Sequence, residues 1–350
     1  MPDSNRAYLL GTLLKGVSRS FYLTLRVLPA GMRDPVGLAY LLARAADTIA
    51  DTSLVDPERR LALLLDLRAQ VNGARDDGTL SRTLATEVAR EQTQSDEKVL
   101  LESIGPALDV LEGFGEADRA AVRDIVTTLT QGMEFDLRTF PDEQSGRILA
   151  LPEPEALDRY TYLVAGCVGE FWTRMTYAHV PGTLKGEPPT VIDRGIRFGK
   201  ALQMTNVLRD TGKDLRIGRC YLPADMLAHH ELRAEDLLLP DASLRARPVR
   251  DALLRTTLAL YRDALAYTLA IPGTAIRLRL ACIWPIIIGL ETLVLLADND
   301  AWLDPARVSK IRRNDVYRIL AYSFAVVMSD SLVTRWVNRL IDAVEARVGV

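Results

Sequence analysis

Apolar residues recur at helical spacing along almost the whole chain, and this periodicity constrains the fold more than any other feature. Alternating patterns bounded by hairpin turns, which are typical of strands, are scarce. Hydrophobic residues make up 48% of the 350 positions, enough to build a large core. The spacing is clearest at Leu61, Leu64, Leu65 and Leu67 and at Leu253, Leu254, Leu258, Leu260 and Leu265. The sequence therefore predicts an all-α protein.

Turn-forming residues and prolines cluster in four segments that mark expected helix ends: residues 72–78, 141–154, 181–189 and 218–248. None of these segments has the composition of a domain linker, and no internal repeat of fixed period occurs. Helices of typical length between the breaks give a bundle of about ten or more helices. We expect one domain covering residues 1–350.

Charge and cysteine usage narrow the class of protein. The formal net charge of −3 offers no basic footprint for a phosphate backbone, so nucleic acid is not an expected partner. The three cysteines stand far apart without a disulfide framework, and Asp3 lies where a secretory signal needs basic residues. The most apolar segment, residues 281–297, is shorter than a membrane span and contains Pro285 and Glu291. We expect a cytoplasmic protein in which this segment is a buried helix.

A stripe of polar residues marks the segment from Tyr40 to Asp51. Spacings of four, three and four residues place side chains on one face of a helix. The members of this stripe are Tyr40, Arg44, Asp47 and Asp51. The leucines and alanines between them suit packing against neighbouring helices, so we expect this helix inside the protein. Two carboxylates buried together need a positively charged partner.

A second stripe has spacings of three, four and four residues. Its members are Gln203, Asn206, Asp210 and Asp214. Carboxylates with an amide nearby are the hard oxygen ligands that Mg²⁺ prefers, and Mg²⁺ usually completes its coordination with water and substrate phosphates. One acid pair alone would be more simply explained as a solvated helix face. Two pairs in otherwise apolar helices favour a magnesium site that handles diphosphates.

Several short motifs occur together over about residues 15–225. They are Ser18-Arg19-Ser20-Phe21, Asp47 to Asp51, Tyr160 to Gly169, Gln203 to Asp214, Gly218-Arg219 and Tyr221-Leu222-Pro223. In this order they resemble the squalene and phytoene synthase family of head-to-head prenyltransferases. The resemblance implies a single α-helical bundle of the isoprenoid synthase type around a deep central apolar cavity, with the two acidic stripes facing each other near its mouth.

The resemblance also implies roles for residues in both stripes. Mg²⁺ would be held by Asp47, Asp51, Asn206, Asp210 and Asp214. The diphosphate and the rest of the substrate would contact Ser18, Arg19, Phe21, Tyr40, Arg44, Gln203 and Arg209. Metal and arginine together would stabilise the negative charge that grows on the departing diphosphate, which is the main barrier to forming an allylic cation.

The segment from Tyr160 to Gly169 would bind the prenyl group. By resemblance, Tyr160 handles a proton during the first condensation, although a buried packing tyrosine is the alternative. Val164 and Ala165 are expected to line a tunnel for the prenyl chain, with Gly166 opening space. Gly166 and Gly169 could instead let two helices approach closely.

Members of the family differ in how the last cation is quenched. Squalene synthases use hydride from NADPH, whereas phytoene and dehydrosqualene synthases lose a proton. A Rossmann-type glycine motif is absent from the sequence. Lys310-Ile311-Arg312-Arg313 resembles a basic motif assigned to NADPH in squalene synthases, so Lys310 and Arg312 are expected to bind this cofactor. A solvated basic patch at the start of a helix is the other explanation.

We therefore expect a squalene synthase that joins two molecules of farnesyl diphosphate, and three alternatives stay open. The chain could be a dehydrosqualene or phytoene synthase, or it could stop at presqualene diphosphate. Residues 281–284 support these alternatives, because eukaryotic squalene synthases carry there a phenylalanine tied to the second half-reaction. A non-catalytic helical lipid-binding or assembly protein is the third, against which the four intact aspartates argue. The carboxy-terminal membrane anchor of eukaryotic members is not expected, and peripheral membrane contact for product release is left open.

Overall fold

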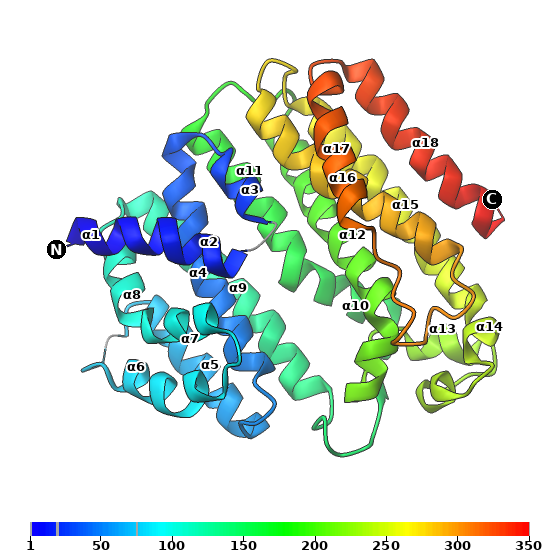
Figure 1. The fold of residues 1–350 in the computed structure, drawn as a ribbon, viewed down its shortest axis with the longest axis horizontal. Helices are drawn as coiled ribbons and strands as arrows, with labels where there is room; N and C mark the ends of the chain where they lie inside the picture. The colour runs from blue at the N-terminus through cyan, green and yellow to red at the C-terminus, as the bar shows by residue number, and fades with distance from the viewer. Residues whose placement is uncertain (1, 19–20, 75, 350) are drawn as a thin grey trace. The chain divides into compact units, whose positions relative to one another are not determined.

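Helices make up nearly all the regular structure of the protein (Figure 1). The computed structural model describes residues 2–18, 21–74 and 76–349. Within these residues the strands are two short segments, Leu149–Ala150 (β1) and Arg219–Cys220 (β2), which pair in parallel. The prediction of an all-α protein is confirmed.

The chain divides into two compact units, Met1–Thr139 and Phe140–Val350. Each unit has its own buried apolar core, which includes the fully buried Leu41 and Leu42 in the first unit and Leu254 in the second. The expectation of one domain over residues 1–350 stays a prediction.

The first unit is built around α4 (Ala30–Asp51), which packs against α5, α8 and α9. Its other elements are α1 (Pro2–Ala7), η1 (Tyr8–Leu13), α2 (Leu14–Ser18), α3 (Phe21–Arg26), α5 (Pro57–Val71), α6 (Thr79–Thr83), η2 (Leu84–Val88), η3 (Ala89–Glu91), α7 (Ser95–Glu102), α8 (Ile104–Glu112) and α9 (Glu116–Thr139). Leu38, Leu41 and Ile49 of α4 are fully buried, so the expectation of an internal helix is confirmed.

Local turn-forming residues set both the start of α5 and the break over residues 72–78 that follows it. The amide of Glu58 donates to the Asp56 carboxylate at 2.9 Å, and Pro57 occupies the first helical position of α5, so this helix begins with a satisfied N-cap. It ends at Val71, and α6 follows Gly78, whose φ of +84° suits glycine.

The second unit is built around α12 (Pro188–Asp214), which packs against α11, α15 and α16. Its other helical elements are α10 (Pro154–Thr161), η4 (Tyr162–Gly166), α11 (Cys167–His179), η5 (Leu215–Ile217), α13 (Ala224–Ala228), η6 (Ala234–Leu238), α14 (Ala242–Arg245), α15 (Arg247–Ala270), α16 (Ile276–Ala297), α17 (Arg313–Val326) and α18 (Asp330–Val348). The break expected over residues 218–248 contains short helices. The side chains of Leu227 in α13 and Leu237 in η6 are buried, and this packing stabilises both helices.

The most apolar helix, α16, is long and apolar enough to cross a membrane, with a mean hydropathy of 2.2. In this structure 72% of that stretch is buried, as in the core helix of a soluble protein. Gly289 packs against Tyr261, because an added Cβ would lie 1.8 Å from the Tyr261 hydroxyl oxygen. That oxygen is 2.9 Å from Thr205 Oγ1. Residues 281–297 therefore form the buried helix that the sequence predicts.

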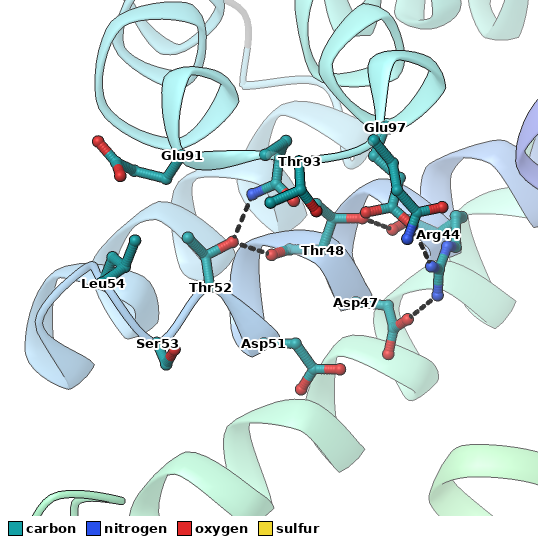
Figure 2. A pocket seen from close by; sticks show the side chains of 12 residues that line it. Arg44, Asp47, Thr48, Asp51, Thr52, Ser53, Leu54, Glu91, Thr93 and Glu97 are labelled. Atoms are coloured by element: carbon teal, nitrogen blue, oxygen red, sulfur yellow. Dashed lines mark hydrogen bonds and ion pairs between the residues drawn. The ribbon is translucent and has the colours of Figure 1, made fainter.

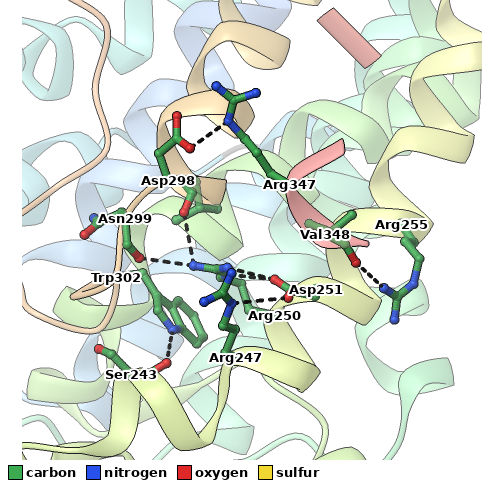
Figure 3. Close-up of polar contacts among 11 residues, drawn as sticks. Ser243, Arg247, Arg250, Asp251, Arg255, Asp298, Asn299, Trp302, Arg347 and Val348 are labelled. Atoms are coloured by element: carbon green, nitrogen blue, oxygen red, sulfur yellow. Dashed lines mark hydrogen bonds and ion pairs between the residues drawn. The ribbon is translucent and has the colours of Figure 1, made fainter. Parts of the chain in front are cut away.

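A buried arginine joins α15 to the end of α16 (Figure 3). Arg250 is 1% exposed and donates to the carbonyl of Leu296 at 3.2 Å and of Asn299 at 3.1 Å. Its other nitrogens donate to Asp251. A cation at this place gives the carbonyls at and just after the helix end a charged donor and complements the negative end of the helix dipole.

Candidate active site

The first acidic stripe lies along the last three turns of α4. The Arg44 guanidinium donates to Asp47 Oδ2 at 2.5 Å and to Glu97 Oε1 at 2.5 Å. Glu97 comes from α7, so it holds Arg44 against α4 from the neighbouring helix. Tyr40 lies one turn earlier and donates from its hydroxyl to the carbonyl of Val17 at 3.5 Å. The structure thus brings the first stripe together as its spacing predicts.

Burial and charge act together on Asp47. Burial raises its pKa to about 6, the nearby carboxylate of Asp51 adds to the rise, and the Arg44 guanidinium opposes it. Asp47 therefore holds its proton more tightly than an ordinary aspartate. A carboxylate with a raised pKa beside a second acid favours the approach of a cation.

A polar pocket of about 370 Å³ opens beside this stripe (Figure 2). Its walls carry four carboxylates and a single guanidinium, that of Arg44. The acids are Asp47, Asp51, Glu91 and Glu97. The floor is formed by hydroxyl and amide groups: Thr52 donates to the carbonyl of Thr48 at 2.6 Å, and Gln92 donates to Thr52 Oγ1 at 2.8 Å. The pocket is anionic and is suited to cations.

The second acidic stripe lies along the last three turns of α12. Arg209 Nε is 3.0 Å from Asp210 Oδ1, and the Asn206 amide donates to Gln203 Oε1 at 3.3 Å. The side chains of Arg209 and Asp210 are 30% and 28% exposed, so both are reachable from solvent while held in place. Asp214, one turn later, is half-buried. All members of this stripe share the helix face that the sequence predicts.

Both acid pairs stand at the carboxyl end of a long helix. Asp51 is the final residue of α4, and Asp214 is the final residue of α12. This end of a helix carries partial negative charge, which stabilises cations and disfavours carboxylates. The last turn of α4 has no basic residue. The last turn of α12 contains Lys213, which offsets part of this cost, so the pair on α4 is the one that a bound cation would stabilise most.

The donor set suits Mg²⁺ by its chemistry. Among the residues that the structure describes, no three His, Cys, Asp or Glu side chains form a cluster that could hold a metal ion. Mg²⁺ is commonly held by one or two carboxylates and completes its octahedron with water and substrate phosphates. Each acid pair meets that requirement without a third protein ligand.

The N-terminal motif is described only in part. Arg19 lies outside the described residues, and so does the side chain of Phe21. Ser18 is buried, and its hydroxyl donates to the carbonyl of Leu14 one turn earlier. The expected contacts of Ser18, Arg19 and Phe21 with substrate stay predictions.

Tyr160 is buried in an aromatic stack. Its ring lies 4.6 Å from that of Tyr221 with 24° between the planes, and Tyr221 meets Phe140 edge-on. The Tyr160 side chain is 5% exposed. The packing alternative is thus supported by these contacts, and the proton-handling role stays a prediction. Sequence reasoning assigned no partner to Tyr160, because Tyr221 is 61 positions away and only the fold brings the rings together.

A π-helical turn, η4, follows Tyr160 and contains the residues expected to line the prenyl tunnel. Val164 and Ala165 are half-buried, and Gly166 is buried. Such turns inside α-helices occur frequently at functional sites. Tyr162 donates to Glu170 Oε2 at 3.0 Å, and burial together with this carboxylate raises the pKa of Tyr162 to about 12, so its hydroxyl stays protonated.

The glycines of this region serve a close helix contact. A Cβ on Gly169 would lie 1.8 Å from the carbonyl oxygen of Gly195, and one on Gly199 would lie 2.1 Å from that of Ala165. The helical packing explanation of Gly169 is therefore observed. Gly195 and Gly199, four residues apart on α12, were missed by the sequence analysis, although their spacing was a readable signal.

The basic motif lies in the segment that leads into α17. Lys310 and Arg312 are exposed, and Arg312 is the N-cap residue of the helix. Neither side chain has an ion-pair partner among the described residues. Both remaining explanations, cofactor binding and a solvated basic patch, fit this placement, and the NADPH role stays a prediction.

Glu97 was also missed by the sequence analysis. It lies 53 positions after Arg44, and no spacing rule connects them. Its carboxylate orients Arg44 and contributes to the charge of the pocket, so it belongs to the site.

Comparison with known proteins places these features in a family. The model of the family described as squalene/phytoene synthase matches residues 14–315. A bifunctional lycopene cyclase/phytoene synthase of Pyrenophora tritici-repentis is 26% identical over 330 residues, covering 92% of this chain and 49% of that protein. A squalene synthase of Dictyostelium discoideum is 28% identical over 224 residues, covering 64% of this chain and 49% of that protein. The chain spans about half the length of these curated relatives.

Solved structures share the fold. A complex of TcSQS with a ligand is 19% identical, with a TM-score of 0.75 and coverage of 99% of both chains. A dehydrosqualene synthase in complex with a ligand is also 19% identical, with a TM-score of 0.61 over 94% of this chain and 98% of that one. The helical architecture is therefore common to enzymes with different named products.

Proposed function

The chain belongs to the squalene/phytoene synthase family, and we propose from this membership that it is a Mg²⁺-dependent head-to-head prenyltransferase. The family is of the prenyltransferase type and acts on prenyl diphosphates. We infer that two molecules of farnesyl diphosphate are condensed to presqualene diphosphate, which NADPH then reduces to squalene.

The observation that carries the proposal is the position of the acid pairs. Asp47 with Asp51 and Asp210 with Asp214 each lie at a helix end that disfavours negative charge. A role in holding Mg²⁺ accounts for both pairs. Asn206 would complete the second group. When bound, Mg²⁺ supplies charge neutralisation to the diphosphate leaving group.

The arginines of the two stripes have a role that follows from their partners. Arg44 pairs with Asp47, and Arg209 pairs with Asp210. A divalent cation competes with each arginine for the same carboxylate. The guanidinium groups are then available to bind phosphate oxygens, for which their planar geometry is suited.

A second candidate differs in how the last cation is quenched. Relatives of similar identity are named as phytoene synthases, and a structural neighbour is a dehydrosqualene synthase. In that case the last cation loses a proton and NADPH is not used. A product that stops at presqualene diphosphate is the intermediate case.

Product analysis distinguishes these candidates. The protein is incubated with farnesyl diphosphate and Mg²⁺, with and without NADPH, and separately with geranylgeranyl diphosphate, and the extracted hydrocarbons are identified by mass spectrometry. Squalene that forms only with NADPH supports the first candidate. Dehydrosqualene or phytoene formed without NADPH supports the second. A folded protein that turns over neither diphosphate would show that the proposed function is wrong.

A further inference from the structure

Arg44 is held by two carboxylates that come from different helices (Figure 2). Its Nη1 donates to Asp47 Oδ2 and its Nη2 donates to Glu97 Oε1, each at 2.5 Å. The remaining donor nitrogen, Nε, is buried and has no hydrogen-bond partner among the residues that the structure describes. Within that part of the chain, Asp47 and Glu97 are therefore the ion-pair partners that fix the guanidinium.

The two carboxylates differ in how they are placed. Asp47 lies near the carboxyl end of α4, where the helix dipole disfavours negative charge, and its side chain is 39% exposed. Glu97 lies in the first turn of α7, where the dipole stabilises negative charge, and its side chain is only 12% exposed. A cation that enters from solvent therefore meets Asp47, while Glu97 is the better protected partner of Arg44.

The second acidic stripe lacks this arrangement. Arg209 pairs with the adjacent Asp210, and in the part of the chain that the structure describes it has no other carboxylate partner. A cation that takes Asp210 must therefore displace Arg209 from its one ion pair. Lys213 adds a further positive charge to the last turn of α12.

We propose that Glu97 is a positioning residue that keeps Arg44 in place when a divalent cation takes Asp47, so that the α4 pair binds such a cation before substrate arrives. This role rests on the proposed function and adds to it a residue and an order of binding. Arg44 retains one charge-assisted hydrogen bond when it gives up the other. Without Glu97 the guanidinium would stay on Asp47 and compete with the cation for the same carboxylate. Glu97 thus acts through Arg44.

Mn²⁺ binding to the full chain, followed by electron paramagnetic resonance of the free ion, tests the proposal without substrate and without turnover. Mn²⁺ takes the place of Mg²⁺ because it favours the same oxygen ligands. We expect the unchanged protein to bind Mn²⁺ in the absence of diphosphate, and Asp51→Asn to weaken this binding by at least about tenfold. Glu97→Gln should also weaken it by about tenfold, because Arg44 then pairs with Asp47 alone.

The matched control is Glu91→Gln, which removes another carboxylate from the wall of the same pocket. The Glu91 side chain points away from Arg44 (Figure 2), so the affinity for Mn²⁺ should fall by no more than about twofold. Thermal melts check that each variant is folded. If Glu97→Gln melts early, Glu97→Asp replaces it: the charge is kept, the carboxylate is withdrawn from Arg44, and the affinity should fall by at least about threefold.

A double-mutant cycle isolates the route through Arg44. In an Arg44→Gln background, Glu97→Gln should change the affinity for Mn²⁺ no more than Glu91→Gln does. Equal losses in the Glu91 and Glu97 variants, or a loss that persists undiminished without Arg44, would show that pocket charge alone matters and would overturn the proposal.

The order of binding has its own test. Mn²⁺ that binds only together with inorganic diphosphate, or binding that Asp210→Asn abolishes and Asp51→Asn leaves intact, would overturn the proposed order while the proposed function stands. If the unchanged protein binds no Mn²⁺ even with diphosphate, the proposed function is contradicted as well.

Discussion

At Asp47 the proposed chemistry and the stability of the fold make opposite demands. Burial raises the pKa of Asp47 to about 6, and the second acid of the pair adds to the rise. The helix end around Asp51 has no basic residue that would compensate. A protein selected only for stability would place a lysine or an amide here. Residues that cost the fold stability are thus ones that the proposed chemistry needs, as is common for functional sites.

Neutralising one acid of either stripe should stop turnover. We expect Asp47→Asn and Asp210→Asn each to lower kcat by at least about a hundredfold, because each removes a charge that holds Mg²⁺ and stabilises the leaving diphosphate. Far-ultraviolet circular dichroism should be unchanged. Asp193→Asn, an exposed position on the same helix as Asp210, is the control and should keep full turnover. Normal turnover of both stripe variants at saturating Mg²⁺ would identify the stripes as solvated helix faces.

The same substitution should alter the pH dependence of stability. Because the folded pKa of Asp47 lies above its usual value, the folded state binds the proton more tightly, and stability falls as pH rises from about 4 to about 6. Asp47→Asn should remove that loss and raise the free energy of unfolding at neutral pH. The side chain is 39% exposed, so solvent screening limits the gain to about 1 kcal/mol or less.

Urea unfolding with a metal chelator, at pH 4 and at pH 7.5, measures this effect. The variant should gain at pH 7.5 and differ little at pH 4. A variant that is less stable than the unchanged protein at both values would contradict the assigned direction of the pKa shift.

At the scale of elements, close contact between helices sets the geometry of the second unit. The backbone of α11 meets that of α12 at Gly169 and Gly195, where no Cβ fits. Four residues further along α12, Gly199 lies close against the carbonyl of Ala165 in the π-helical turn η4. The residues between Tyr160 and Gly169 are thereby held at a fixed distance from the helix that carries the second acidic stripe. Packing and site geometry depend on the same glycines.

Gly169→Ala should therefore separate the two helices. Its Cβ would lie 1.8 Å from the Gly195 carbonyl oxygen, which cannot move without shifting α12. We expect a loss of at least about 3 kcal/mol in the free energy of unfolding, measured by thermal and urea melts. Gly11→Ala is the control: no atom lies within 4 Å of the added Cβ, and alanine should be neutral or slightly stabilising there. Equal effects at both positions would contradict a packing role for Gly169.

For the molecule as a whole, the two proposed half-reactions would use different segments. The acid pairs lie on α4 and α12, whereas Lys310 and Arg312 lie on the approach to α17. If the latter bind NADPH, the two half-reactions can be separated by mutation.

Lys310→Ala with Arg312→Ala should impair the reductive step and leave the first condensation largely working. Weaker NADPH binding removes the final quench without removing the groups that ionise the first substrate. Presqualene diphosphate, dehydrosqualene or hydroxylated products should replace squalene, as mass spectrometry of the extracted products would show. Arg233→Ala with Arg245→Ala, two other exposed basic positions, is the control. If the variant forms squalene with an unchanged NADPH Michaelis constant, the motif is a solvated basic patch at the start of a helix.

Local pattern determined much about this protein. Helical periodicity predicts the all-α class, and the spacings of four, three and four residues are enough to place Asp47 and Asp51 on one helix face. The family follows from motifs that are each local in sequence. These features could be read because they depend on neighbours along one helix, where geometry is set by the 3.6-residue repeat.

Tertiary structure decided what depends on residues far apart in the chain. It alone paired Arg44 with Glu97, stacked Tyr160 on Tyr221 and brought the Gly195 backbone against Gly169. It also showed that α17 leaves apolar side chains exposed on its outer face. The physical reason is that packing between elements and the burial of charge are set by long-range contacts, which the spacing of residues along one helix does not encode.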